Sequence, residues 1–211
     1  SFRINRTQLS NLNIFLKRNI RGFVTATGEL KGKISNPNLS INFDVDYPHY
    51  KGIRIREKWV GNIKNNNREF LLNMNNGSSP IPSFLTINFD SNLKMDNLTF
   101  TRVFNSNKGI LEIVNENNSY IWKADNFPLD ELELSIRNNQ FDRIKGIING
   151  SGSISSDQTN VDGRLAWSLG KYRNIELDNS LFDFSFKNNI FNVSSSLYPT
   201  DGGVIEVDYD S

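Results

Sequence analysis

Apolar and polar residues alternate along most of this chain. Between Leu39 and Val45, the apolar residues Leu39, Ile41, Phe43 and Val45 alternate with polar ones, so that on an extended strand all four point to one face. The same alternation returns in the segments Leu85-Ile87-Phe89, Leu132-Leu134-Ile136, Val161-Leu165-Trp167-Leu169, Phe182-Phe184-Phe186 and Ile205-Val207-Tyr209. The pattern predicts strands with one apolar face and one polar face.

Short turn signals separate these segments. They include Asn36-Pro37-Asn38, Asn76-Gly77-Ser78, Lys108-Gly109, Asp162-Gly163 and Asp201-Gly202-Gly203. Because consecutive strands joined by tight turns run in opposite directions, we expect antiparallel pairing throughout.

Two stretches are candidates for a short helix. Between Gln8 and Arg18, apolar residues recur at three- and four-residue spacing. Between Pro128 and Arg137, a proline opens the segment and acidic residues follow it, as at the start of a helix. The alternating leucines of the second stretch fit a strand as well. We expect one or two short helices in an otherwise all-β chain.

The chain repeats itself after 120 residues without a gap, so that residues 1–91 match residues 121–211. The two copies share apolar positions at even spacing, with glycines at the joints. Matching pairs include Leu9 and Leu129, Gly32 and Gly152, Ile41 and Val161, and Ile87 and Val207. Such a repeat preserves a surface and a strand order, whereas catalysis needs one irregular polar cluster. We expect residues 1–211 to be one continuous segment of a longer β-repeat array without enzyme activity.

The composition narrows the classes of function. The chain has 24 Lys and Arg against 23 Asp and Glu, with both signs scattered, so it lacks the basic stripe typical of nucleic-acid binding. It has no Cys and one His, which leaves little material for a transition-metal site or a histidine-based triad. The acidic pairs Asp44/Asp46 and Asp208/Asp210 fall on the polar side of their strands, as solvated groups do. We expect no catalytic residue, metal or cofactor.

The three tryptophans could stack on sugar rings or lie at a membrane interface. Trp122 and Trp167 alternate with apolar neighbours, which favours packing, while Trp59 has no such context. Periodicity alone also leaves open whether the apolar face fills a closed core or lines a groove.

One ordered motif carries a family resemblance. The string from Gly28 to Ile34 reads Gly-x-Leu-x-Gly-x-Ile, and the turn Asn36-Pro37 and an alternating strand follow it. The second copy has a related glycine-rich string from Ile144 to Ile154. The order of a leucine-containing helix, this pair of strands and a Pro- or Gly-marked turn resembles the TamB family of cell-envelope proteins, within the AsmA-like group.

This resemblance implies an antiparallel sheet curved into an open U-shaped groove, known as a β-taco. It implies a translocation and assembly module in the periplasm, its parent protein anchored in the inner membrane, that shields acyl chains during phospholipid transport and outer-membrane biogenesis. The implied partners are phospholipid acyl chains and an outer-membrane barrel protein of the Omp85 type, with no nucleic acid. The groove lining would be Leu39, Ile41, Phe43, Val45, Leu85, Ile87, Phe89, Leu165, Trp167, Leu169, Phe182, Phe184, Phe186, Val193, Ile205 and Val207.

Other functions are compatible with the same pattern. The chain could be a structural or adhesive β-repeat module with a filled core. It could also assist outer-membrane protein assembly without conducting lipid. A carbohydrate-active enzyme would need two acids facing each other across a cleft, and the sequence shows no such pair.

Overall fold

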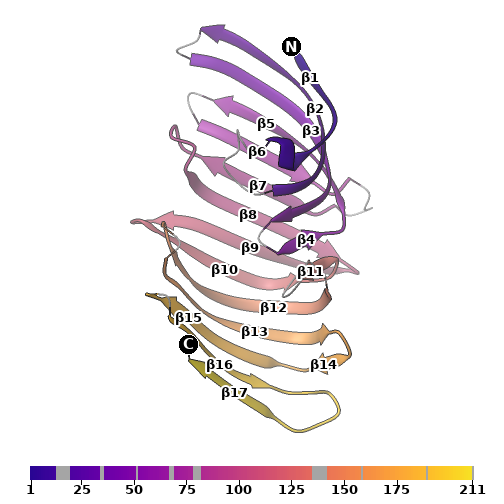
Figure 1. Cartoon of the computed structure of the whole chain (residues 1–211), viewed down its shortest axis with the longest axis vertical. Helices are drawn as coiled ribbons and strands as arrows, with labels where there is room; N and C mark the ends of the chain where they lie inside the picture. Colours follow the sequence, from indigo (N-terminus) through magenta and orange to yellow (C-terminus); the bar gives the residue numbers. More distant parts are fainter. Residues whose placement is uncertain are drawn as a thin grey trace. The chain divides into compact units, whose positions relative to one another are not determined.

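The chain folds into β-strands joined by short turns (Figure 1). The computed structural model describes residues 1–12, 20–33, 36–50, 52–66, 69–77, 82–134, 142–157, 159–188 and 190–210. Every strand pair recorded among them is antiparallel, and these residues include no α-helix. The prediction of an all-β, antiparallel fold is confirmed.

The strands belong to two compact units, one of residues 1–96 and 131–142, the other of residues 97–130 and 143–211. The first unit contains β1 (Phe2–Gln8), β2 (Ile20–Lys33), β3 (Asn36–Tyr50), β4 (Ile53–Ile55), β5 (Lys58–Asn66), β6 (Glu69–Asn75), β7 (Phe84–Phe89) and β11 (Leu132–Leu134). The second contains most of β8 (Met95–Phe104) and β12 (Asp142–Ser155), with β9 (Asn107–Glu116), β10 (Ser119–Pro128), β13 (Val161–Tyr172), β14 (Ile175–Leu177), β15 (Ser180–Lys187), β16 (Ile190–Leu197) and β17 (Ile205–Asp210).

Within each unit the strands pair mainly with their neighbours in the chain. In the first unit, β1, β2, β3, β5, β6 and β7 pair in this order, while the short β4 pairs with the end of β3. In the second, the order is β8, β9, β10, β12, β13, β15, β16 and β17, with β14 beside the end of β13. Successive hairpins thus build both sheets. Of the predicted turns, Asn76-Gly77 and Asp201-Gly202-Gly203 lie between strands. The predictions of turns at Asn36-Pro37-Asn38, Lys108-Gly109 and Asp162-Gly163 are wrong, because these residues pair within β3, β9 and β13.

The two repeat copies share an interruption of strand register. The pairing of β1 with β2 shifts between Ile4 and Thr7. The pairing of β10 with β12 shifts between Ala124 and Phe127, which are the matching positions 120 residues later. A bulge of this kind bends a strand and re-aims its side chains. The copies therefore agree in local backbone geometry as well as in sequence.

A second type of interruption, which occurs in each copy but not at matching positions, overturns one site prediction. Gly22 (φ 125°) lies beside Tyr47 (φ 51°) in one copy, and Gly146 (φ 114°) lies beside Leu169 (φ 51°) in the other. A positive φ is rare for a bulky residue and breaks the alternation of a strand. The Leu169 side chain is consequently 70% exposed. The prediction that Leu169 belongs to the apolar groove lining is wrong.

The helix predictions are wrong within the described residues. Leu9–Leu12 forms a single turn of 3-10 helix, η1, and residues 13–18 of that prediction lie outside the described residues. The second stretch instead contains the end of β10, a turn and β11, and residues 135–137 again lie outside the described residues. Pairing of β11 with β4 explains the difference, because tertiary contacts override a weak local preference for helix.

The pairing of β11 with β4 is held by a buried carboxylate. Glu133 is 5% exposed and accepts a hydrogen bond from Arg54 Nε at 2.6 Å. The Arg56 Nε atom lies 3.5 Å from the other carboxylate oxygen of Glu133. Strand β11 thereby covers the edge of β4, which the sequence pattern predicts to be uncovered. The expectation of an open groove is wrong at this edge, because β11 pairs with β4 there. The alternation pattern could not predict this pairing, which joins residues 79 positions apart.

One end of the first unit has a filled core. Leu9 of η1 packs with Val24, Ala26 and Val45, and all four are buried. Val45 is among the residues that the sequence analysis places in a groove lining. It lies instead in a closed cluster, because η1 covers this end of the sheet.

We predict that Glu133→Ala lowers the free energy of unfolding by about 2 kcal/mol, because it leaves two arginines without their buried acceptor. Both arginines are more than a third exposed, so hydration offsets part of the loss. Chemical denaturation measures the change, with Glu112→Ala on β9 as the control, where we expect less than about 0.5 kcal/mol. Equal stability of the two variants would contradict the assignment.

Candidate functional site

The strand register of the first unit places apolar side chains and glycines directly opposite one another across six strands. One row consists of Phe2, Gly28, Ile41, Ile63, Leu72 and Ile87, and the next of Ile4, Ala26, Phe43, Gly61, Met74 and Leu85. No polar side chain interrupts either row. At about 4.8 Å between strands, each row spans roughly 24 Å. We call this surface the first apolar face.

The second unit has an equivalent surface across eight strands, the second apolar face. One row consists of Leu98, Ile113, Trp122, Gly152, Gly163, Phe184, Val193 and Tyr209, and the next of Phe100, Leu111, Ala124, Gly150, Leu165, Phe182, Ser195 and Val207. Ser195 is the only polar member of these two rows and is 5% exposed. Each row spans roughly 34 Å at the usual strand spacing.

Aromatic rings lie over glycines on both apolar faces. The rings of Trp122 and Phe184 stack at 11° with their centroids 6.2 Å apart. A Cβ atom added at Gly163 would collide with the Trp122 indole and lie 2.8 Å from Phe184 Cζ. In the first unit, a Cβ at Gly61 would lie 2.9 Å from Phe43 Cζ. The glycines therefore make room for rings that lie along the sheet and smooth its surface.

The structure places most of the predicted groove residues on these two faces. On the first apolar face, six predicted residues are half-buried: Leu39, Ile41, Phe43, Leu85, Ile87 and Phe89. Those of the second unit are Leu165, Trp167, Phe182, Phe184, Phe186 and Val193. Ile205 and Val207 lie on the same face of β17 but are 47% and 39% exposed. Val45 is buried in the filled core, and Leu169 points away to solvent.

Sequence reasoning missed the part of the second apolar face that β8, β9 and β10 contribute. The residues concerned are Leu98, Phe100, Leu111, Ile113, Trp122 and Ala124. Their strands alternate only weakly, so the pattern alone did not assign them to the surface. Their turn signals and two-residue periodicity, aligned hairpin by hairpin, could have found them.

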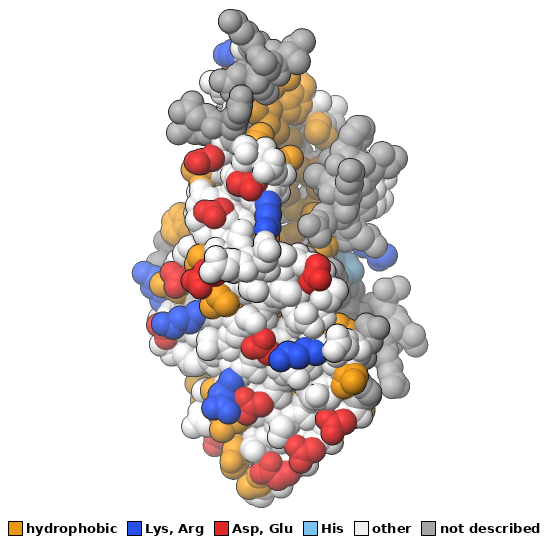
Figure 2. Space-filling view, turned by 90° about the vertical axis from the view of Figure 1, so that its left-hand side faces the viewer, with side chains coloured by type: hydrophobic (Ala, Val, Ile, Leu, Met, Phe, Trp, Pro, Cys, Tyr) orange, Lys and Arg blue, Asp and Glu red, His pale blue; other side chains and the backbone are white. Residues whose placement is uncertain are grey.

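Charged groups lie on the opposite, polar faces of the strands. Lys58 Nζ lies 2.8 Å from Asp44 in the first unit, and Arg164 Nε lies 2.6 Å from Asp183 in the second. The hydrogen bond that Lys58 donates to Asp44 raises the pKa of Lys58, which stays exposed. Figure 2 shows acidic and basic side chains scattered among neutral ones on one face of the molecule. These pairs keep charge away from the apolar rows.

His49, the one histidine of the sequence, lies opposite Arg21 on β2 and Arg54 on β4. Burial lowers the pKa of His49, and the charges of the two arginines lower it further. Both arginines lie on strands that pair with β3, so strand pairing itself brings their charges close to His49.

The two apolar faces can bind a ligand through apolar contact. Among the described residues, no group of three or more His, Cys, Asp or Glu side chains is placed to hold a metal ion. The described part of the chain also has no helix with the length and apolar character needed to cross a membrane. Comparison with family models, curated protein sequences and solved structures finds no match. The resemblance to the TamB family therefore stays a prediction.

We predict that Gly163→Ala lowers the free energy of unfolding by about 2 kcal/mol, because the new methyl group displaces Trp122 and Phe184. Near-ultraviolet circular dichroism should show a changed tryptophan signal. In Gly77→Ala, the nearest atoms lie 3.5 Å and 3.6 Å from the added carbon, so we expect a change within about 0.5 kcal/mol. An unaltered tryptophan spectrum in Gly163→Ala would show that the ring does not depend on this glycine.

Proposed function

We propose that the two apolar faces shield lipid acyl chains, and that the chain is a segment of a periplasmic envelope protein that carries phospholipid towards the outer membrane. One observation carries this proposal: apolar rows cross six strands of the first unit without a polar side chain. The TamB-like motif at Gly28–Ile34 supports the location and the cargo class.

The length of the rows suits an acyl chain. One acyl chain occupies one leaflet, which is half of the roughly 30 Å hydrocarbon core of a bilayer. The apolar rows, at about 24 Å, are longer than that. An unpaired polar group along such a path would cost several kcal/mol. The sheet avoids that cost because its backbone groups pair within the strands.

The partial burial of the row residues also supports contact with a ligand. Ile41, Phe43, Leu85 and Ile87 are half-buried, so each has surface left for further contact. Part of the burial of Ile41 and Phe43 comes from packing against the filled core. The row that includes Val24, Val45 and Trp59 is buried instead. We therefore assign acyl contact to the half-buried members of the rows of Ile41 and Phe43, and exclude the filled end under η1, which includes Ala26 of the Phe43 row.

Apolar contact of this kind is unspecific and is reversible over a short length. Each buried CH₂ contributes about 0.8 kcal/mol, whatever the head group of the lipid. A surface that binds by methylene contact alone accepts many lipids and releases them stepwise. That property suits a conduit better than a storage site.

A second candidate is a structural β-repeat module without lipid. The cluster of Leu9, Val24, Ala26 and Val45 favours it, because this part of the sheet is filled by its own chain. The proposed inner-membrane anchor of the parent protein, an Omp85-type partner and a role in outer-membrane protein assembly rest on the resemblance alone.

Photo-crosslinking of adjacent positions tests the proposal. A benzophenone side chain at Phe184 or Phe43 should capture phospholipid several-fold more than one at Ser185 or Asn42, because neighbouring residues of a strand face opposite sides. Vesicles of mixed phospholipids provide the lipid, and mass spectrometry identifies the adducts. Unfolding midpoints control for damage to the fold. Equal capture at both members of each pair would favour the module without lipid.

A further inference from the structure

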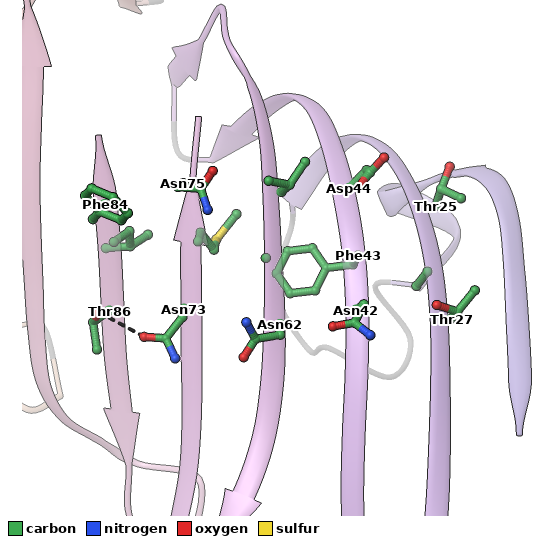
Figure 3. A pocket seen from close by; sticks show the side chains of 15 residues that line it. Thr25, Thr27, Asn42, Phe43, Asp44, Asn62, Asn73, Asn75, Phe84 and Thr86 are labelled. Carbon is green, nitrogen blue, oxygen red and sulfur yellow. Dashed lines mark hydrogen bonds between the residues drawn. The ribbon is translucent and has the colours of Figure 1, made fainter. Parts of the chain in front are cut away.

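The polar face of the first unit contains a transverse hollow of about 650 Å³. It crosses β2, β3, β5, β6 and β7, each of which contributes three consecutive residues (Figure 3). The outer two residues of each triplet form its walls, and the strand backbone between them forms the floor. One wall is Thr27, Asn42, Asn62, Asn73 and Thr86, and the other is Thr25, Asp44, Val60, Asn75 and Phe84.

From this lining we infer that the hollow binds an extended, neutral carbohydrate chain laid across the strands. Asn42, Asn62 and Asn73 stand directly opposite one another, one on each of three neighbouring strands. Their spacing of about 4.8 Å is close to the length of one pyranose ring. Each carboxamide offers two donors and an acceptor, which is the set that neighbouring sugar hydroxyls require. Successive sugars along a chain would therefore each meet one amide.

The amides of this wall are available to a ligand. Thr86 donates a hydrogen bond to Asn73 Oδ1 at 3.0 Å, which fixes the orientation of that amide and leaves its NH₂ group free to donate (Figure 3). Among the described residues, none forms a hydrogen bond with the side chain of Asn42 or of Asn62. The ladder thus has unused hydrogen-bonding capacity within the part of the chain that the structure describes.

The opposite wall adds an aromatic platform. Phe84 is 52% exposed at one end of the hollow and presents an apolar ring, on which the C–H face of a sugar can stack. Asp44 is the only charged residue of the lining, and Lys58 lies 2.8 Å from it. Because the lining contains no lysine or arginine, it suits a neutral chain better than a polyanion.

A second hollow, which lies in the second unit, has different chemistry. Its walls carry Asp162, Asp183, Asp208 and Asp210 together with Arg164, where the first unit has amides and threonines. The two copies therefore share their apolar rows but not the lining of their polar hollows. We restrict the carbohydrate site to the first unit. The site lies on the polar face, so its test does not depend on lipid binding by the apolar rows.

Isothermal titration of the whole chain with cellohexaose and with chitohexaose tests the site. We expect saturable binding of at least one of them. Asn62→Thr should weaken it by roughly three- to tenfold, which corresponds to one lost hydrogen bond. Phe84→Ala should weaken it by a similar factor through loss of the stacking surface. Asn115→Thr is the matched control, because it makes the same change in β9 on the second apolar face, and its affinity should equal that of the unmodified chain.

Three results would overturn the site. The first is the absence of saturable binding of either oligosaccharide at millimolar concentration. The second is equal affinity of all three variants, with unchanged unfolding midpoints. The third is binding of an extended Asn-rich peptide at the same residues in the absence of any sugar binding, which would assign the hollow to peptides.

Discussion

Strand register is the constraint on which the rest of this structure depends. Because side chains alternate along a strand, a slip of one residue in any hairpin would move a whole strand's apolar set to the polar face. In the first unit, three successive pairings keep Ile41, Ile63, Leu72 and Ile87 in one row. Glycines opposite the aromatic rings hold that register further, since Gly163 or Gly61 at another position would leave a ring without space.

The same register places apolar side chains on one side of the sheet and polar side chains on the other. Phe43 belongs to an apolar row, while its neighbours Asn42 and Asp44 face the polar hollow. Backbone hydrogen bonds are satisfied in the plane between them, so neither surface has to supply partners for the chain. This arrangement places the proposed acyl-binding face and the proposed carbohydrate groove on opposite sides of the same strands.

Local pattern was sufficient to predict the strands, but not every position on them. The alternation around Ile41 and Phe184 predicted both their strands and their faces, because these segments lie in uninterrupted hairpins. Leu169 was misplaced, because a positive φ at a bulge reverses its direction and no residue type marks it. Glu133 was misassigned to a helix, because its buried bond to Arg54 joins segments that are distant in the sequence. The polar hollow was missed for a similar reason, since its amide ladder exists only once three strands are aligned.

The account depends most on acyl chains lying along the apolar rows. Paramagnetic relaxation with nitroxide-labelled stearic acid, read out from the methyl resonances of the whole chain, tests this directly. The account predicts strong broadening of Ile41, Ile63, Leu72 and Ile87 together, with Val60 on the opposite face unaffected. Equal broadening of Val60 and these four residues, or broadening of none of them, would contradict it.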